Sequence, residues 1–589
     1  MSKRLPEVDA VIVGMGWTGS IMARELSRAG LQVVALERGA ARYPGEEFVL
    51  PAIRDELRYA VRQELMLDPA TETVTLRHDA NQTALPVRRY SAFLPGDGVG
   101  GMGTHWNGQT YRFLPSDHQL KTALTARYGA KKIPADMLIA DWGISYDELE
   151  SYYDRFEKLC GISGQAGNLR GKIIEGGNPF EGWRSDDYPN KPLKPSYANQ
   201  IFESAAKSLG YHPFPSPAGN ASEAYTNPEG MTLGPCQYCG HCERFGCEAN
   251  AKASPHTTLL PALAKEPKVE IRDHAYVSRL GYDKKGKKVT SVFYVDMRTG
   301  EEIEQPAGLV ILAGWVFTNT HLLLHSGIGT PYDAKSGRGV VGRNYCYQVR
   351  STVNLFLDGK ELNPFMGAGA LGMVIDDFNG DNFDHGPLDF LGGGYLVLST
   401  LGGRPIQTRP LPPGTPRWGA EWKKATAKWY RSSAAIACQG SNYASRGNYL
   451  DLDPTYRDIL GRPLLRMTYN FTENDLRMSA FVTEKATGIA KAMGASIVSG
   501  TPLKGDFDVV PYQSSHNTGG TPMGTDPKTS VVNRHLQCWD AHNLFILGAS
   551  VFPQNAGYNP TGPVGALTYW AAEAITKRYL HHPDALIPA

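Results

Sequence analysis

The chain has no long hydrophobic run and almost no excess of charge of either sign. Its longest apolar stretch, 309–317, is about half the length that a membrane-spanning helix needs. Sixty Lys and Arg residues stand against 59 Asp and Glu, and the lysines at 284–288 are interpreted as a solvated turn. These absences argue against a transmembrane segment and against a nucleic-acid partner.

Cysteine is scarce, and half of it is concentrated in one short segment. Four of the 8 cysteines are Cys236, Cys239, Cys242 and Cys247. A disulfide framework is spread more evenly and belongs to smaller secreted chains, so the cluster suggests a metal site. The first eight residues lead almost directly into an apolar strand, so we expect no signal peptide.

Three apolar strands that end in glycine recur at widely separated places, 10–14, 309–314 and 544–548. A chain of 589 residues is too long for a single core, so more than one folding unit is expected. We predict that these strands join one doubly wound α/β domain assembled from discontinuous segments. The alternating pattern within 346–505 predicts a second, α+β domain with a mostly antiparallel sheet.

The first of these strands runs into a dinucleotide-binding fingerprint. Gly14 allows the tight turn, Gly16 lets the backbone approach a pyrophosphate, and Gly19 lets the following helix pack on the strand. Glu37 ends the next strand, where an acid can bind a ribose hydroxyl. A turn that is only structural is the alternative, but strand, helix, strand and acid are all in register.

A second glycine-rich loop favours FAD over NAD as the nucleotide. Glu37 and Arg38 resemble the adenosine end of flavoprotein sites. The loop itself contains Gly100, Gly101, His105 and Asn107, and NAD enzymes have no standing use for such a loop.

These motifs resemble the glucose–methanol–choline (GMC) oxidoreductase family across nearly the whole chain. The matching segments are 14–19, 98–112, 314–329, 516–524 and 559–561. Within the family, the chain is most similar to the flavoprotein subunits of bacterial membrane-associated sugar and sugar-acid dehydrogenases. The resemblance implies that His516 is the catalytic base and Asn559 its partner, and that Val277, Gly314 and Ala549 contact the FAD. An imidazole near neutral pKa can take a hydroxyl proton while hydride leaves for flavin.

Two details of the cofactors stay open. In pyranose oxidases, which this chain resembles at 104–106, the histidine is joined covalently to the flavin; His105 either forms that bond or packs against the ring without it. The spacing of Cys236, Cys239, Cys242 and Cys247 is typical of an iron–sulfur loop, and the resemblance implies a [3Fe–4S] or [4Fe–4S] cluster. With three ligands, Cys236, Cys242 and Cys247 match best, and Cys239 is spare. Zinc and disulfides are the alternatives.

The implied function is an FAD-dependent dehydrogenase that oxidises a secondary or anomeric alcohol of a sugar, polyol or sugar acid such as gluconate. Electrons would leave through the cluster to a cytochrome. An oxygen-using carbohydrate oxidase of pyranose-oxidase type is the second interpretation, and a flavin-bearing electron-transfer or structural subunit with a degenerate active site is the third. Arginines of the second domain can pair with a sugar-acid carboxylate, although surface ion pairs are the commoner use (Arg350, Arg404, Arg409 and Arg417).

The resemblance also implies partners, a location and a domain order. A small subunit with an export signal and a multihaem cytochrome c are the expected partners, at the periplasmic face of the inner membrane; a chain acting alone would stay cytoplasmic. We predict an FAD-binding part at 1–120, a substrate-domain and connecting segment at 121–200, and a second FAD-binding part at 201–345 with the cysteine cluster 236–247. The substrate-binding domain is expected at 346–505, and a third FAD-binding part with the catalytic residues at 506–589.

Overall fold

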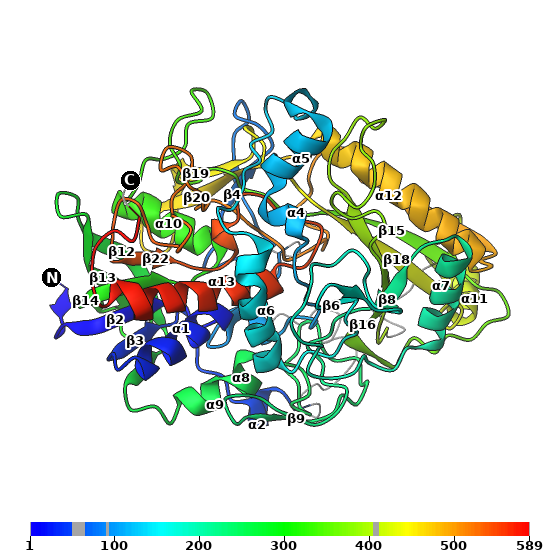
Figure 1. Cartoon of the computed structure of the whole chain (residues 1–589), viewed down its shortest axis with the longest axis horizontal. Coiled ribbons are helices and arrows are strands. Elements are labelled where there is room, and N and C mark those ends of the chain that lie inside the picture. The colour runs from blue at the N-terminus through cyan, green and yellow to red at the C-terminus, as the bar shows by residue number, and fades with distance from the viewer. Residues whose placement is uncertain (1, 50–64, 90–92, 404–410, 588–589) are drawn as a thin grey trace.

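A mixed sheet organises the half of the molecule that contains both chain ends (Figure 1). The computed structural model describes residues 2–49, 65–89, 93–403 and 411–587. The order within the sheet is β11 (Val269–Arg272), β3 (Val33–Leu36), β2 (Val8–Val13), β14 (Glu302–Leu312), β13 (Lys288–Asp296) and β12 (Ala275–Asp283), with β1 (Lys3–Arg4) and β22 (Leu544–Ile546) also paired to β14.

The three strand–glycine segments lie side by side in this sheet, as predicted. Strand β14 pairs in parallel with β2 on one side and with β22 on the other. Val11, Val310 and Phe545 are fully buried, because helices cover a parallel sheet on both faces and its strands are therefore apolar throughout. The doubly wound domain is thus built from the beginning, middle and end of the chain.

Helices pack around this sheet, and a helix near the start of the chain contacts one near its end. Helix α1 (Trp17–Arg28) starts at the glycine fingerprint and is followed by Gly30, whose φ of +98° suits a helix end. Helix α13 (Thr561–Ala574) packs on α1 and on α6 (Tyr146–Cys160), and α10 (Val316–Ser326) packs on β12. In Figure 1, α13 lies above α1.

An antiparallel sheet forms the other half of the molecule. Its order is β21 (Ile497–Thr501), β15 (Val349–Phe356), β18 (Ser433–Gly440), β17 (Gly394–Leu401), β16 (Gly367–Ile375) and β8 (Pro213–Pro215). Helices α12 (Glu473–Ala492) and α7 (Tyr197–Ser208) cover one face, where Val353, Leu396 and Ile436 join their core. Side chains alternate between faces along a strand. The intervening residues of β15, β17 and β18 therefore point the other way, toward the mixed sheet.

A smaller sheet and short elements complete the described part of the chain. The sheet contains β19 (Tyr449–Arg457), β20 (Pro463–Thr468), β4 (Thr75–Arg77) and β5 (Leu85–Pro86). The other elements are α2 (Pro44–Glu47), α4 (Pro115–His118), α5 (Leu120–Tyr128), α8 (Pro255–Thr258), α9 (Leu260–Leu263), α11 (Gly419–Trp429), β6 (Asn168–Leu169), β7 (Lys172–Ile173), β9 (Tyr225–Thr226) and β10 (Thr232–Leu233).

Each large sheet contains strands from several parts of the chain, so the domains are not consecutive ranges of residues. The range 201–345, predicted as the second FAD-binding part, also gives β8 to the antiparallel sheet, where it pairs with β16. The domain boundaries therefore stay predictions.

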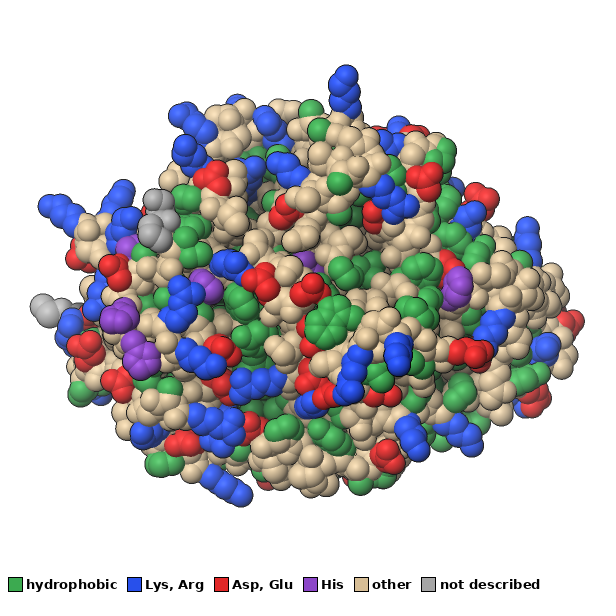
Figure 2. All heavy atoms as spheres, viewed as in Figure 1, with side chains coloured by type: hydrophobic (Ala, Val, Ile, Leu, Met, Phe, Trp, Pro, Cys, Tyr) green, Lys and Arg blue, Asp and Glu red, His purple; other side chains and the backbone are tan. Residues whose placement is uncertain are grey.

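Figure 2 shows Lys and Arg side chains interspersed with Asp and Glu over the visible face. Among the described residues, no helix is both long and apolar enough to cross a bilayer.

Candidate active site

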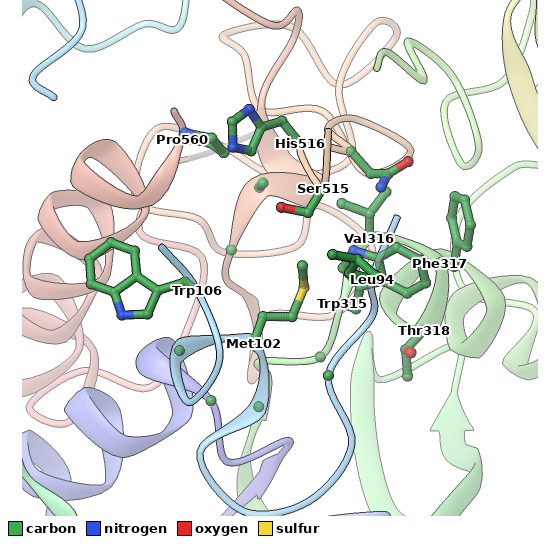
Figure 3. A pocket seen from close by; sticks show the side chains of 18 of the residues that line it. Leu94, Met102, Trp106, Trp315, Val316, Phe317, Thr318, Ser515, His516 and Pro560 are labelled. Carbon is green, nitrogen blue, oxygen red and sulfur yellow. The ribbon is translucent and has the colours of Figure 1, made fainter. Parts of the chain in front are cut away.

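A cavity of about 430 Å³ lies where the two large sheets face each other. Its walls come from the glycine fingerprint, the second glycine-rich loop, the inward face of the antiparallel sheet and the C-terminal segment. In Figure 3, His516 lies beside Pro560 at one side of this space, and Met102 and Trp106 of the second loop lie across from them. Segments that are hundreds of residues apart therefore share one site.

Two of the three fingerprint glycines, Gly14 and Gly19, have a steric reason to be glycine. Gly14 has a φ of +99°, and a Cβ there would come within 2.8 Å of the Ala313 carbonyl oxygen. A Cβ at Gly19 would meet the Gly14 carbonyl oxygen at 1.9 Å, so this residue keeps α1 close to the strand turn. At Gly16 a Cβ would meet nothing within 4 Å, because it would point into the cavity, and this open space fits a pyrophosphate.

Glu37 and Arg38 line the same end of the cavity. The Glu37 carboxylate accepts hydrogen bonds from the backbone N–H groups of Met15 (2.9 Å) and Gly39 (3.0 Å). Burial raises its pKa, and the two N–H donors oppose that shift. Arg38 donates to Glu72, and its buried Nε lies 3.6 Å from Asp97 Oδ1 without a hydrogen bond among the described residues. Polar groups are thus placed where a nucleotide needs them.

The second loop is folded against the first and lines the middle of the cavity. The Gly100 N–H donates to the Met15 carbonyl oxygen over 2.8 Å, and Gly100 and Gly101 both have positive φ. His105 is only 3% exposed, and its Nε2 has no partner among the described residues. Burial and the nearby Lys252 charge lower its pKa to about 3. The other predicted cofactor contacts also line the cavity (Asn107, Val277, Gly314 and Ala549).

The open cradle at Gly16 and the orphaned, buried ring nitrogen of His105 are features that a bound FAD would complete. Gly19 and Gly100 shape the loops without lining the cavity. The residues therefore fit the predicted cofactor.

The structure brings His516 and Asn559 together, as the sequence predicted. The Asn559 Nδ2 and His516 Nε2 atoms are 3.2 Å apart, and both residues line the cavity. On the other side of the ring, Nδ1 contacts the Gln348 carbonyl oxygen Oε1. Because Gln348 Nε2 donates to the Gly557 carbonyl oxygen over 2.8 Å, its oxygen must face the histidine. His516 therefore carries its proton on Nδ1 and leaves Nε2 as an acceptor.

The amide of Asn559 is oriented just as strictly. Its Oδ1 accepts from the Tyr395 hydroxyl (2.8 Å) and from Gln439 Nε2 (2.9 Å), so Nδ2 is the atom that faces His516. Burial lowers the pKa of His516 to about 3, and the Arg350 charge contributes. At neutral pH the imidazole is thus uncharged, and its basic nitrogen faces the cavity.

Gln348, Tyr395 and Gln439 were not found from the sequence. Tyr395 and Gln439 are directly opposite each other on β17 and β18, and both point away from the helices. The only signal was the alternation of polar with apolar residues along these strands, which does not say what the polar face meets.

The arginines of the second domain differ in their burial and in their position relative to the cavity. Arg350 is half-buried and lines the cavity, whereas Arg417 is exposed. Arg404 and Arg409 lie outside the described residues.

The four clustered cysteines are free thiols in one loop. Burial raises the pKa of Cys236 to about 12, and the charges of the other three thiols act in the same direction, so all four share one neighbourhood. Within the described residues, however, no three Cys, His, Asp or Glu side chains converge closely enough to hold a metal ion. The thiols therefore fit a metal site in type and neighbourhood but not in mutual distance, and the structure gives no support to the disulfide alternative.

The cysteine loop is fastened directly to the second glycine-rich loop. The backbone N–H of Arg244 donates to the His105 carbonyl oxygen over 2.8 Å. Lys252, fully buried, donates from Nζ to the carbonyl oxygens of Trp106 (2.7 Å), Cys242 (2.7 Å) and Phe245 (2.8 Å). A single buried cation thus ties the two loops together.

Two models of the GMC oxidoreductase family match the chain, one over residues 142–350 and one over residues 444–568. The chain is 48% identical to the gluconate 2-dehydrogenase flavoprotein of Pantoea cypripedii, over 100% of this chain and 97% of that one. It is 26% identical to the fructose dehydrogenase large subunit of Gluconobacter japonicus, over 98% and 99% of the two chains.

Solved structures have the same fold. Pyridoxine 4-oxidase from Mesorbium loti aligns with a TM-score of 0.59 at 18% identity, covering 98% of this chain and 100% of that one. Formate oxidase from Aspergillus oryzae RIB40 aligns with a TM-score of 0.60 at 14% identity, covering 99% of each chain. The chain belongs to the GMC oxidoreductase family. It is an FAD-dependent oxidoreductase that acts on alcohol groups.

Proposed function

We propose that the chain is the flavoprotein of a dehydrogenase that oxidises a secondary hydroxyl of a sugar, polyol or sugar acid, with gluconate as the leading substrate. The observation that carries the proposal is the oriented pair of His516 and Asn559 at the cavity wall. The relative from Pantoea cypripedii supports gluconate, because the similarity to it extends over the whole chain.

The side chains of this pair have complementary tasks. FAD, when bound, would supply the acceptor for the hydride, one proton and two electrons, that leaves the carbinol carbon. His516 Nε2 takes the hydroxyl proton, and Gln348 holds Nδ1–H so that the ring presents the correct nitrogen. Asn559 Nδ2 donates toward the same place and holds the substrate oxygen without competing for its proton. The first turn of α13 directs its N–H groups to this side of the cavity.

Substrate oxidation by the purified, flavin-loaded chain tests the proposal. With an artificial electron acceptor, gluconate should bleach the flavin anaerobically and sustain turnover, and under air it should release little hydrogen peroxide. Stoichiometric peroxide would favour the oxygen-using carbohydrate oxidase instead. A flavin that no sugar, polyol or sugar acid reduces would contradict both activities.

We also propose that His105 holds the FAD covalently. The support is its buried Nε2, which lines the cavity, is uncharged at neutral pH and has no partner among the described residues. Acid precipitation should leave yellow colour with the protein and should release all of it in His105→Ala. Flavin that stays in the supernatant of the unaltered protein contradicts the bond.

The cysteine loop is proposed to hold an iron–sulfur cluster, [3Fe–4S] or [4Fe–4S]. Four free thiols in one neighbourhood support it, and ligation requires the loop to close further. Protein prepared anaerobically should contain about three or four irons per chain, with matching sulfide and a paramagnetic signal. Cys242→Ala should lose the iron, whereas Cys438→Ala, on the core side of β18, should keep it. Zinc in place of iron would refute the cluster.

The proposed assembly places this chain in a complex at the periplasmic face of the inner membrane. A small subunit with an export signal and a multihaem cytochrome c are its proposed partners. The fructose dehydrogenase relative is named as a large subunit, which agrees with a multi-subunit enzyme. Co-purification of the chain with a haem-containing protein from membranes checks this arrangement, and recovery as a free cytoplasmic protein contradicts it.

A further inference from the structure

Arg350 brings a positive charge to the catalytic end of the cavity. It projects from β15, and Nη1 donates to the carbonyl oxygen of Gln513. Its guanidinium lies over the Tyr512 ring, 5.8 Å from the centroid. Among the described residues no carboxylate forms an ion pair with it, although it is half-buried. Glu243 lines the same cavity, and burial together with the Glu243 charge raises the pKa of Tyr512.

Strand register places Arg350 next to the catalytic pair. Arg350 is directly opposite Gln439 on β18, and Gln439 is directly opposite Tyr395 on β17. Side chains at such cross-strand positions have Cβ atoms about 5 Å apart. Because Gln439 and Tyr395 both hydrogen-bond to Asn559, the guanidinium lies one side chain away from the group that holds the reacting oxygen.

The wall beside Arg350 has room for a chain of carbons. The residues near it on the inward face of the sheet are small or of medium size (Thr352, Ala435, Ala437 and Val397), and polar groups lie farther along the wall (Ser399 and Gln109). Gln109 Nε2 and Ser399 Oγ lie 3.3 Å apart, and both can bind hydroxyls. A cation at one end and hydroxyl-binding groups at the other suit an acyclic polyhydroxy acid.

We propose that Arg350 binds the carboxylate of a 2-hydroxy acid whose 2-hydroxyl faces His516 and Asn559. The inference rests on the proposed function and deepens it, because it selects sugar acids over neutral sugars and polyols. A carboxylate and a 2-hydroxyl sit on adjacent carbons, so the cation must lie close beside the base, which is where the strand register puts it. Guanidinium matches a carboxylate with two parallel N–H donors. A neutral polyol would offer this cation no carboxylate.

Comparing gluconate with its uncharged amide, gluconamide, tests the role of Arg350. We expect the unaltered enzyme to prefer gluconate by about 100-fold in kcat/KM, the size of a charge-assisted pair. Arg350→Met should abolish that preference, mostly by raising KM for gluconate. Arg417→Met, which alters an exposed arginine of the same domain, should change neither substrate.

Chemical rescue adds a readout that a structural role would not give. Guanidinium ion should restore gluconate oxidation in Arg350→Ala and leave gluconamide oxidation unaffected. Loss of both substrates to the same extent in Arg350→Met, or an unchanged KM for gluconate, would overturn the assignment. Equal kcat/KM for the two substrates in the unaltered enzyme would overturn it too, while leaving oxidation of the hydroxyl in place. If neither substrate is oxidised, the proposed function fails and the assignment fails with it.

Discussion

Replacing His516 with alanine should lower kcat by about a thousandfold while the flavin stays bound, because a positioned general base contributes on that scale. Nε2 is the atom lost, and no other described side chain is held by both Gln348 and Asn559. Stopped-flow reduction of the flavin by substrate measures the step directly. His581→Ala, at an exposed position near the C-terminus, is the control and should match the unaltered enzyme.

The pH dependence of the same step follows from the burial of His516. Burial and the Arg350 charge lower its pKa to about 3, so the neutral form persists well below the usual histidine pKa of about 6.5. The rate of flavin reduction should therefore stay level between about pH 8 and pH 5.5 and should fall only at lower pH. A rate that halves near pH 6.5 would mean that the ring titrates as an exposed histidine does. If His516→Ala does not lower kcat by about a thousandfold, His516 is not the base.

Gly19→Ala should abolish flavin binding and destabilise the fold by about 3 kcal/mol, as overpacking does at its upper range. The new Cβ would lie 1.9 Å from the Gly14 carbonyl oxygen, a backbone atom that cannot rotate away. Helix α1 must then move off the strand turn, and its N-terminal N–H groups leave the cavity. The ratio of flavin to protein absorbance and a thermal melt of the flavin-free protein report the two effects separately.

Gly488→Ala is the matched control, because it also replaces a helical glycine. This residue is exposed on α12, and a Cβ there would meet nothing within 4 Å. Alanine has the higher helix propensity, so this variant should gain about 1 kcal/mol and keep its flavin. If the Gly19→Ala protein retains flavin and melts like the unaltered one, the turn between β2 and α1 can accommodate a Cβ, and the tight packing of Gly19 on Gly14 is not required.

Local sequence was sufficient for the nucleotide half of the site. Its predicted residues lie in short segments, namely the fingerprint glycines, Glu37 and the second loop. The local backbone geometry and hydrogen bonds at these positions restrict which residue type can occupy them. His516 and Asn559 came from a resemblance that places motifs in order, and the structure brings them to 3.2 Å from each other. Their roles as base and partner stay predictions.

The orienting residues could not be predicted because their function depends on strand register. Tyr395 and Gln439 are 44 positions apart in the sequence and meet only because β17 and β18 pair with a particular register. A slip of either strand by one residue would turn its side chain toward α12 and separate the two. Arg350 is a similar case: the sequence showed an arginine in a strand, but not which face it occupies. The cysteine loop shows the converse, since a clear spacing does not fix the distances between thiols.

One face of the antiparallel sheet packs against helices and the other lines the cavity. Because the two faces are separate, the substrate specificity can change without a change in the core. Val353 and Ile436 hold the sheet to its helices, while their neighbours Thr352 and Ala435 form the wall of the cavity. Substitutions on the wall side therefore need not loosen the hydrophobic packing behind it, and His516 and Asn559 come from a different segment of the chain. Single substitutions on the cavity side of these strands can therefore change the substrate specificity while His516 and Asn559 are kept.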